Sequence, residues 1–98
     1  MTHTEERLQD RNIRLTPSQV LGYVYEYGDL AQHVAVIIGR VDFQGDSSVA
    51  YRNRHESNGD LIVLIIRNMQ PMTIMYRRSN QNNTIEGLRV NRLVDLTQ

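Results

Sequence analysis

The run Leu61–Ile66, "LIVLII", constrains the fold of this chain more than any other segment. Every position is apolar, so a strand formed there presents apolar side chains to both faces of a sheet. Such a strand needs a cover on each face. The run is also far shorter than the roughly 18 residues that a membrane-spanning helix requires. We therefore expect Leu61–Ile66 to lie near the middle of a sheet in a globular domain.

Two helices are expected before this strand. In "LTPSQVLGYVYEYGD", Thr16 and Gln19 form a capping box around Pro17, which predicts a helix over residues 17–27 that ends at Gly28. The side chains expected to face the core are Val20, Leu21, Val24 and Tyr27, which recur at helical spacing. The preceding "THTEERLQDRN" predicts a shorter surface helix over residues 3–12.

From residue 32 onward, the pattern changes to short segments that are rich in Val, Ile and Tyr. These are "HVAVIIGRVDF", "SVAYRNRH", "LIVLIIRN" and "MTIMYRRS", separated by turn formers that include Asn58-Gly59. Short connections predict neighbouring antiparallel strands, a meander. The final segment, "TIEGLRVNRLVDLTQ", permits a helix capped by Thr84. Its two-residue apolar period favours a fifth strand within residues 85–96.

The fold class expected from these elements is α+β, with two N-terminal helices packed on a four- to five-stranded antiparallel sheet. The chain has 98 residues, which suits a single domain spanning 1–98. The helices would cover one face of the sheet. The other face needs the C-terminal segment or a second subunit, so a homodimer is an expected state.

The overall charge is zero, but its distribution along the chain is uneven. Residues 1–46 hold four Arg against seven Asp and Glu, and residues 47–98 hold seven Arg against four. A local basic patch can therefore bind anions despite overall neutrality. Every cation is Arg and Lys is absent, which excludes lysine-based catalysis.

Several classes of protein are disfavoured by what the sequence lacks. Cysteine is absent, which excludes a disulfide framework and thiol chemistry. His3, His33 and His55 have no metal-ligand spacing, so neither a metal nor another cofactor is expected. The polar first residues contain no apolar signal region, so we expect a cytoplasmic protein with no membrane partner.

The candidate functional residues are the Arg, His and Tyr side chains of the expected strands. "AYRNRH" places Arg52, Arg54 and His55 directly before the apolar run. For acid–base chemistry on an RNA phosphate, the catalytic candidates are Arg54, His55, Tyr76 and Arg78. Arg52, Arg67 and Arg77 are candidates for anion binding. The alternative is that these side chains form the solvated polar face of an edge strand, paired with Asp or Glu.

The N-terminal pattern "HTEERLQDRNIRLTPSQV" carries a family resemblance. Its His3, Arg7, Arg11 and Ile13, followed by a Thr-Pro cap, resemble the opening of a family of small bacterial and phage proteins. That family in turn resembles the BrnT- and RelE-type toxins of the barnase/RelE-like fold, which cleave RNA without a metal. The resemblance implies RNA cleavage by basic and aromatic side chains of the sheet. The matching residues are His3, Arg7 and Arg11, and an antitoxin is the implied partner. The neutral charge and missing lysine depart from these toxins.

Two functions from different classes follow from this sequence. The first is a metal-independent endoribonuclease of the toxin type that acts on RNA through Arg, His and Tyr of the sheet. The second is a non-catalytic phage or bacterial protein that docks onto a protein partner, such as a host target, or sequesters an anionic nucleotide.

Overall fold

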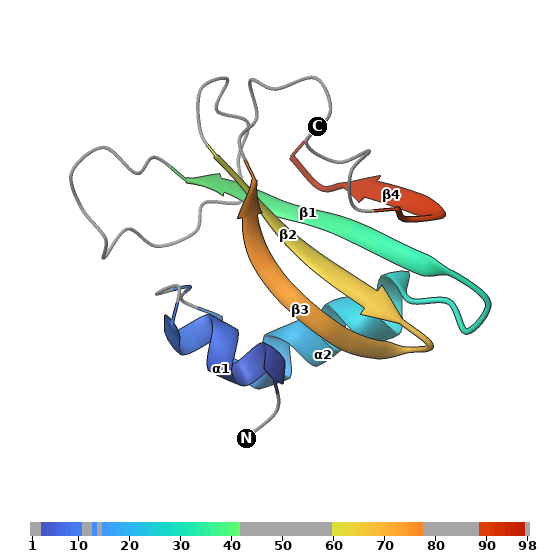
Figure 1. Cartoon of the computed structure of the whole chain (residues 1–98), viewed down its shortest axis with the longest axis horizontal. Helices are drawn as coiled ribbons and strands as arrows, with labels where there is room; N and C mark the ends of the chain where they lie inside the picture. Colours follow the sequence, from blue (N-terminus) through green and yellow to red (C-terminus); the bar gives the residue numbers. More distant parts are fainter. Residues whose placement is uncertain (1–2, 11–12, 14, 42–59, 78–88, 98) are drawn as a thin grey trace.

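The computed structural model of the chain describes residues 3–10, 13, 15–41, 60–77 and 89–97. Its elements follow in the order α1 (His3–Asp10), α2 (Pro17–Tyr27), β1 (His33–Val41), β2 (Asp60–Arg67), β3 (Gln70–Arg77) and β4 (Arg92–Asp95). The two helices precede a four-stranded sheet, as Figure 1 shows. The expected α+β class with two N-terminal helices is confirmed. None of the helices in the described part of the chain is long and apolar enough to cross a membrane.

The capping residues of α2 act as the sequence predicts. The Thr16 hydroxyl accepts a hydrogen bond from the Gln19 amide at 3.1 Å, and the Gln19 side chain accepts one from the Thr16 amide at 2.8 Å. These two bonds satisfy amide groups that the helix itself leaves unpaired. The helix ends at Gly28, whose amide donates to the Val24 carbonyl at 2.8 Å.

The sheet order is β3-β2-β1-β4, with β2 between its two antiparallel neighbours, β1 and β3. This arrangement confirms that Leu61–Ile66 is a central strand. It contradicts the meander that placed residues 49–55 beside residues 61–67, because β1 and β3 occupy both edges of β2. Residues 49–55 and the Asn58-Gly59 turn lie outside the described residues.

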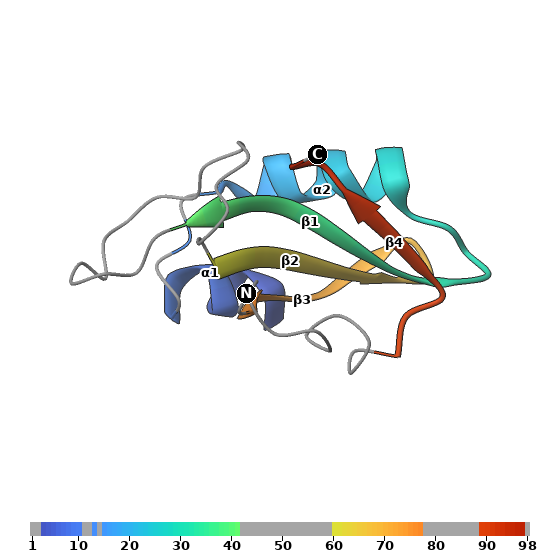
Figure 2. The same ribbon diagram turned by 90° about the horizontal axis from the view of Figure 1, so that it is seen from above.

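The sheet is mixed, so the expectation of purely antiparallel strands is wrong. β4 pairs parallel to β1, with Arg92 opposite Val34 and Asp95 opposite Ile37 (Figure 2). The cause is the direction of the chain. β3 ends at Arg77, beside Leu61, whereas β4 begins beside Val34 at the opposite end of the sheet. Since the chain returns to that end before β4 begins, β4 runs in the same direction as β1.

Both helices cover the same face of the sheet, where α1 contacts β3 and α2 contacts β3 and β1. The apolar side chains between them form the helix-face core: Leu8, Ile13, Leu15, Val20, Val24, Val34, Val36, Ile38, Ile62, Leu64, Ile66 and Ile74. The second-face cluster consists of Ala35, Ile37, Leu61 and Val63, with Val90 packed against it. Both faces of β2 are therefore buried, as its composition predicts.

Candidate functional site

The start of β1 and the end of β2 meet at one end of the sheet. His33 and Arg67 are register partners there, so their Cα atoms face each other across the two strands. β2 then turns into β3 through Asn68 and Met69, whose φ angles are 52° and 59°. Two successive residues with positive φ fit a tight hairpin turn, and Asn tolerates this conformation better than most residues. The hairpin therefore fixes Arg67 and Asn68 beside His33.

Asn91 joins the same end of the sheet from the segment before β4. Its side-chain oxygen accepts a hydrogen bond from the backbone amide of His33 at 2.9 Å. The backbone amide of Asn91 donates to the His33 carbonyl at 2.9 Å. These two bonds extend the β1–β4 pairing by one residue. They also orient the side chain: with its oxygen engaged by an amide, the NH₂ group of Asn91 points the other way and is a donor.

These residues line the sheet-end pocket, a shallow depression of about 220 Å³. It is formed by Ala31, Gln32, His33, Arg67, Asn68 and Asn91. None of these lining residues is acidic, and the guanidinium and amide groups are hydrogen-bond donors. The nearby carboxylate of Asp29 accepts a hydrogen bond from the Ala31 amide at 2.8 Å, which holds it in the turn before β1. The pocket is therefore suited to an anion.

Arg92, next in the chain to Asn91, is directed elsewhere. Its guanidinium donates to the Tyr27 carbonyl at 3.5 Å, at the C-terminal end of α2. A cation is favourable there because the helix dipole is negative at that end. Arg67 is accordingly the guanidinium of the sheet-end pocket.

The structure does not gather the described candidate residues into one site. Arg77 is opposite Leu61 and Arg67 is opposite Gln70, at the two ends of the β2–β3 pair. Six residue steps along β2 separate these positions by roughly 20 Å. Tyr76 is opposite Ile62 and packs against the helix-face core. His3 and Arg7 lie on α1, which packs on β3.

The remaining candidates, Arg11, Arg52, Arg54, His55 and Arg78, lie outside the described residues. The arrangement of Arg54 and His55 around a phosphate therefore stays a prediction. No group of three or more His, Asp or Glu within the described part of the chain is placed to hold a metal ion.

Of the residues that line the sheet-end pocket, the sequence predicts only Arg67 as a site residue. His33 was considered only as a metal ligand, and Asn68 and Asn91 carried no functional signal of their own. Their common feature is position: each lies at a strand end, next to a chain reversal. The sequence could have identified such positions only with the strand pairing in hand.

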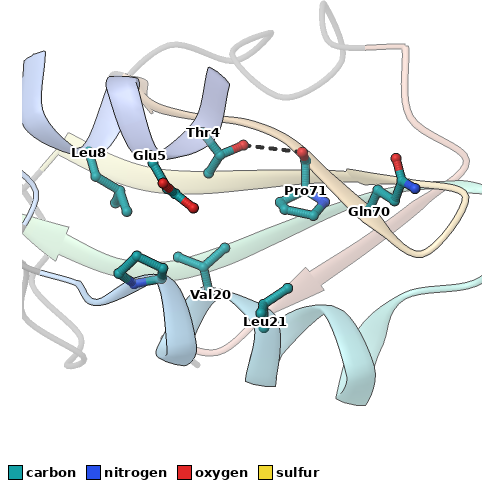
Figure 3. Close-up of a pocket in the computed structure, with 8 residues that line it drawn as sticks. Thr4, Glu5, Leu8, Val20, Leu21, Gln70 and Pro71 are labelled. Carbon is teal, nitrogen blue, oxygen red and sulfur yellow. Dashed lines mark hydrogen bonds between the residues drawn. The ribbon is translucent and has the colours of Figure 1, made fainter. Parts of the chain in front are cut away.

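A second concavity, the helix groove, lies between α1, α2 and the start of β3 and has a volume of about 450 Å³. It is lined by Thr4, Glu5, Leu8, Pro17, Val20, Leu21, Gln70 and Pro71 (Figure 3). The Thr4 hydroxyl donates to the Pro71 carbonyl at 3.2 Å, which ties α1 to β3 at one side of the groove. Its walls are mainly apolar, in contrast to the sheet-end pocket.

Comparisons with protein-family models, with curated proteins and with solved structures found no match to this chain.

Proposed function

We propose that this protein is a small binding protein that holds a phosphate-bearing ligand in the sheet-end pocket. One observation carries the proposal: Arg67 shares this pocket with His33 and the side chains of Asn68 and Asn91, and no lining residue is acidic. A phosphate offers only acceptor oxygens and negative charge, and this lining supplies donors and a cation.

Arg67 is the group expected to dominate the affinity. A guanidinium can make two parallel hydrogen bonds to one phosphate, and it keeps its charge at any physiological pH. The oriented NH₂ group of Asn91 adds a neutral donor, and the imidazole of His33 adds an N–H donor. The fitting ligand class is a nucleotide or the backbone of an RNA strand, which agrees with the anionic ligand expected from the sequence.

The test is a titration followed by NMR amide shifts, with inorganic phosphate, a mononucleotide and a short single-stranded RNA as probes. Phosphate-bearing probes should shift the amides of His33, Asn68 and Asn91. Arg67→Gln should weaken binding by about tenfold or more, since a hydrogen bond to a charged group contributes about 1.5–3 kcal/mol. Arg92→Gln is the matched control, because it removes the same charge from the same end of the sheet without altering the pocket lining.

The proposal fails if none of the three probes shifts these amides, or if Arg92→Gln weakens binding as much as Arg67→Gln. The second result would indicate a diffuse charge effect rather than a site. If the RNA binds but inorganic phosphate and the mononucleotide do not, the main contacts with the RNA lie outside this pocket.

A metal-independent ribonuclease is the second candidate function. It is favoured by the juxtaposition of an imidazole, His33, with a guanidinium, Arg67, which is a minimal pair for moving a proton and stabilising phosphorane charge. The chemistry of Arg54, His55, Tyr76 and Arg78 and the resemblance to RelE-type toxins support the same activity. An antitoxin partner and a homodimer belong to this proposal.

Its test is cleavage of labelled mixed-sequence RNA in the presence of EDTA. Loss of cleavage in Arg54→Ala and His55→Ala would assign the reaction to the residues predicted from the sequence. Loss in His33→Ala and Arg67→Ala would assign it to the sheet-end pocket. Intact RNA on both sides of neutral pH would overturn the ribonuclease and leave the binding function.

A further inference from the structure

The turn between β2 and β3 holds a methionine in a backbone conformation that methionine rarely adopts. Asn68 and Met69 have φ angles of 52° and 59°, and Arg67 and Gln70 are register partners on either side of them. A two-residue turn of this kind favours glycine at its second position, because a Cβ atom is sterically unfavourable there. Contacts of the Met69 side chain are therefore needed to hold this conformation.

The Met69 side chain lies between β2 and the end of α2. It is half-buried and packs against the helix-face core. A Cβ atom added to Gly28 would lie 2.9 Å from the Met69 sulfur and 3.3 Å from a methyl group of Ile66, so the thioether lies against this glycine. In Figure 1 the β2–β3 turn accordingly lies beside the end of α2. Met69 thus joins the hairpin to the helix.

The surroundings of the sulfur are suited to an apolar thioether and not to a polar group that accepts hydrogen bonds. The Gly28 amide already donates to the Val24 carbonyl at 2.8 Å, and the Arg92 guanidinium is directed to the Tyr27 carbonyl. The C-terminal end of a helix is also the negative end of its dipole. A sulfoxide oxygen, which accepts hydrogen bonds and carries partial negative charge, is unfavourable in this place.

The same turn carries two residues of the sheet-end pocket. Arg67 and Asn68 directly precede Met69 and line that pocket, and both are exposed, so the backbone of the turn fixes where they lie. Release of Met69 from α2 would remove contacts that hold the turn in its left-handed conformation. Arg67 and Asn68 would then lose their fixed placement beside His33.

We infer that Met69 is an oxidation-sensitive switch for ligand binding in the sheet-end pocket, an inference that rests on the phosphate binding proposed above. The oxidant is a peroxide: one of its oxygen atoms is transferred to the Met69 sulfur, the O–O bond breaks and an S=O bond forms. The thioether is thereby oxidised to the sulfoxide, and hydrogen peroxide is reduced to water. The oxidised side chain leaves the end of α2, the hairpin loosens, and the affinity for phosphate falls. A methionine sulfoxide reductase reverses the change.

The test compares mononucleotide binding by the whole protein before and after treatment with hydrogen peroxide. Oxidation should weaken binding about five- to tenfold, because only molecules with an ordered hairpin bind. Met69→Leu should bind within about twofold of the unaltered protein and keep that affinity after treatment, because leucine has a similar volume and no sulfur. Met72→Leu is the matched control. It removes a neighbouring methionine that is 43% exposed and lies outside the pocket lining, so this variant should still lose affinity on oxidation.

A second measurement separates this inference from the proposed function. Hydrogen exchange of the Gly28 amide should accelerate when Met69 is oxidised, and it should stay slow in peroxide-treated Met69→Leu. If the untreated protein binds no mononucleotide, the proposed function itself fails. If it binds, and peptide mass spectrometry finds Met69 sulfoxide without loss of affinity, only the switch is overturned. Equal loss of affinity in treated Met69→Leu overturns it as well, and unchanged exchange of the Gly28 amide does so whatever the result for binding.

Discussion

Two glycines of the α2 region show how differently single positions are constrained. A Cβ atom at Gly22 would meet nothing within 4 Å. At Gly28 it would lie 2.5 Å from the Val24 carbonyl oxygen and 2.9 Å from the Met69 sulfur. The φ angle of Gly28 is −69°, which any residue can adopt. Glycine is therefore required at this position by the close neighbouring atoms and not by a left-handed backbone. The helix end packs against the β2–β3 hairpin because no side chain intervenes.

Alanine at these two positions should therefore change stability in opposite directions. Gly28→Ala should destabilise the protein by about 1–3 kcal/mol, because the clashing carbonyl is held by the Gly28 amide and cannot move away freely. Gly22→Ala should stabilise it by about 0.5–1 kcal/mol through helix propensity. Urea denaturation measures both changes. Similar values for the two variants would contradict the close approach at Gly28.

The titration of the Tyr27 phenol differs from that of an ordinary tyrosine. Burial raises the pKa of the Tyr27 phenol, and the Glu26 carboxylate raises it further through its charge and a hydrogen bond. The ring also stacks on Tyr23, with centroids 6.4 Å apart. The fold therefore favours the neutral phenol, so its contribution to stability is complete below the pKa of an unfolded tyrosine and is lost as the pH rises through the higher folded value.

This shift predicts a specific alkaline behaviour. Glu26→Gln should bring the pKa of Tyr27 back toward its ordinary value, as measured by the ultraviolet absorbance of tyrosinate after subtraction of a Tyr27→Phe titration. Tyr27→Phe should also flatten the loss of stability at alkaline pH. Tyr25→Phe, which removes the hydroxyl of a largely exposed tyrosine, serves as the control. An unchanged alkaline profile in Tyr27→Phe would refute the linkage.

At the scale of elements, α1 depends on contacts with the rest of the fold. It is short, and isolated helices of this length are unstable in water. Leu8 enters the helix-face core, and Thr4, which is 2% exposed, binds the Pro71 carbonyl. These two residues are one turn apart on the same side of the helix. They fix α1 on β3 and thereby form one wall of the helix groove.

Thr4→Val tests this attachment, because it keeps the shape of the side chain and removes the hydroxyl. The Pro71 carbonyl would lose a partner, which should cost about 1–3 kcal/mol in the free energy of unfolding. Hydrogen exchange of the α1 amides should accelerate at the same time. Thr4→Ser retains the hydroxyl and should preserve slow exchange. Unchanged exchange in Thr4→Val would show that Leu8 alone holds the helix.

At the scale of the whole molecule, the β2–β3 hairpin lies between the two concavities. Arg67 and Asn68 line the sheet-end pocket, and Gln70 and Pro71 line the helix groove. The two linings share no residue and differ in chemistry: one is rich in donors and the other is apolar with a carboxylate. The two concavities are therefore separate features of the surface.

We therefore expect phosphate binding to be independent of the helix groove. Arg67→Gln should weaken phosphate binding by about tenfold or more, whereas Leu21→Ser should leave it within about twofold, since distant sites usually behave additively. Isothermal titration of a mononucleotide with both variants provides the measurement. If Leu21→Ser weakens binding as much as Arg67→Gln, the hairpin couples the two concavities.

Features of the fold that depend on near neighbours in the chain follow from local sequence patterns. The Thr16–Gln19 capping box closes within one helical turn, so the limits of α2 follow from a few adjacent residues. Leu61–Ile66 is apolar on both faces, and a strand with that pattern is buried whatever its neighbours are. For the candidate site, the sequence identified Arg67 as an anion-binding residue, a role that stays a prediction.

Which distant segments meet depends on the packing of the whole chain. Leu21 was expected in the core, yet it is partly exposed at the helix groove, because α1 and β3 leave space beside it. The pairing of His33 with Arg67, and the parallel placement of β4 that brings Asn91 to them, join residues far apart in the chain. Strand order and register depend on packing over the whole sheet, which no local pattern specifies.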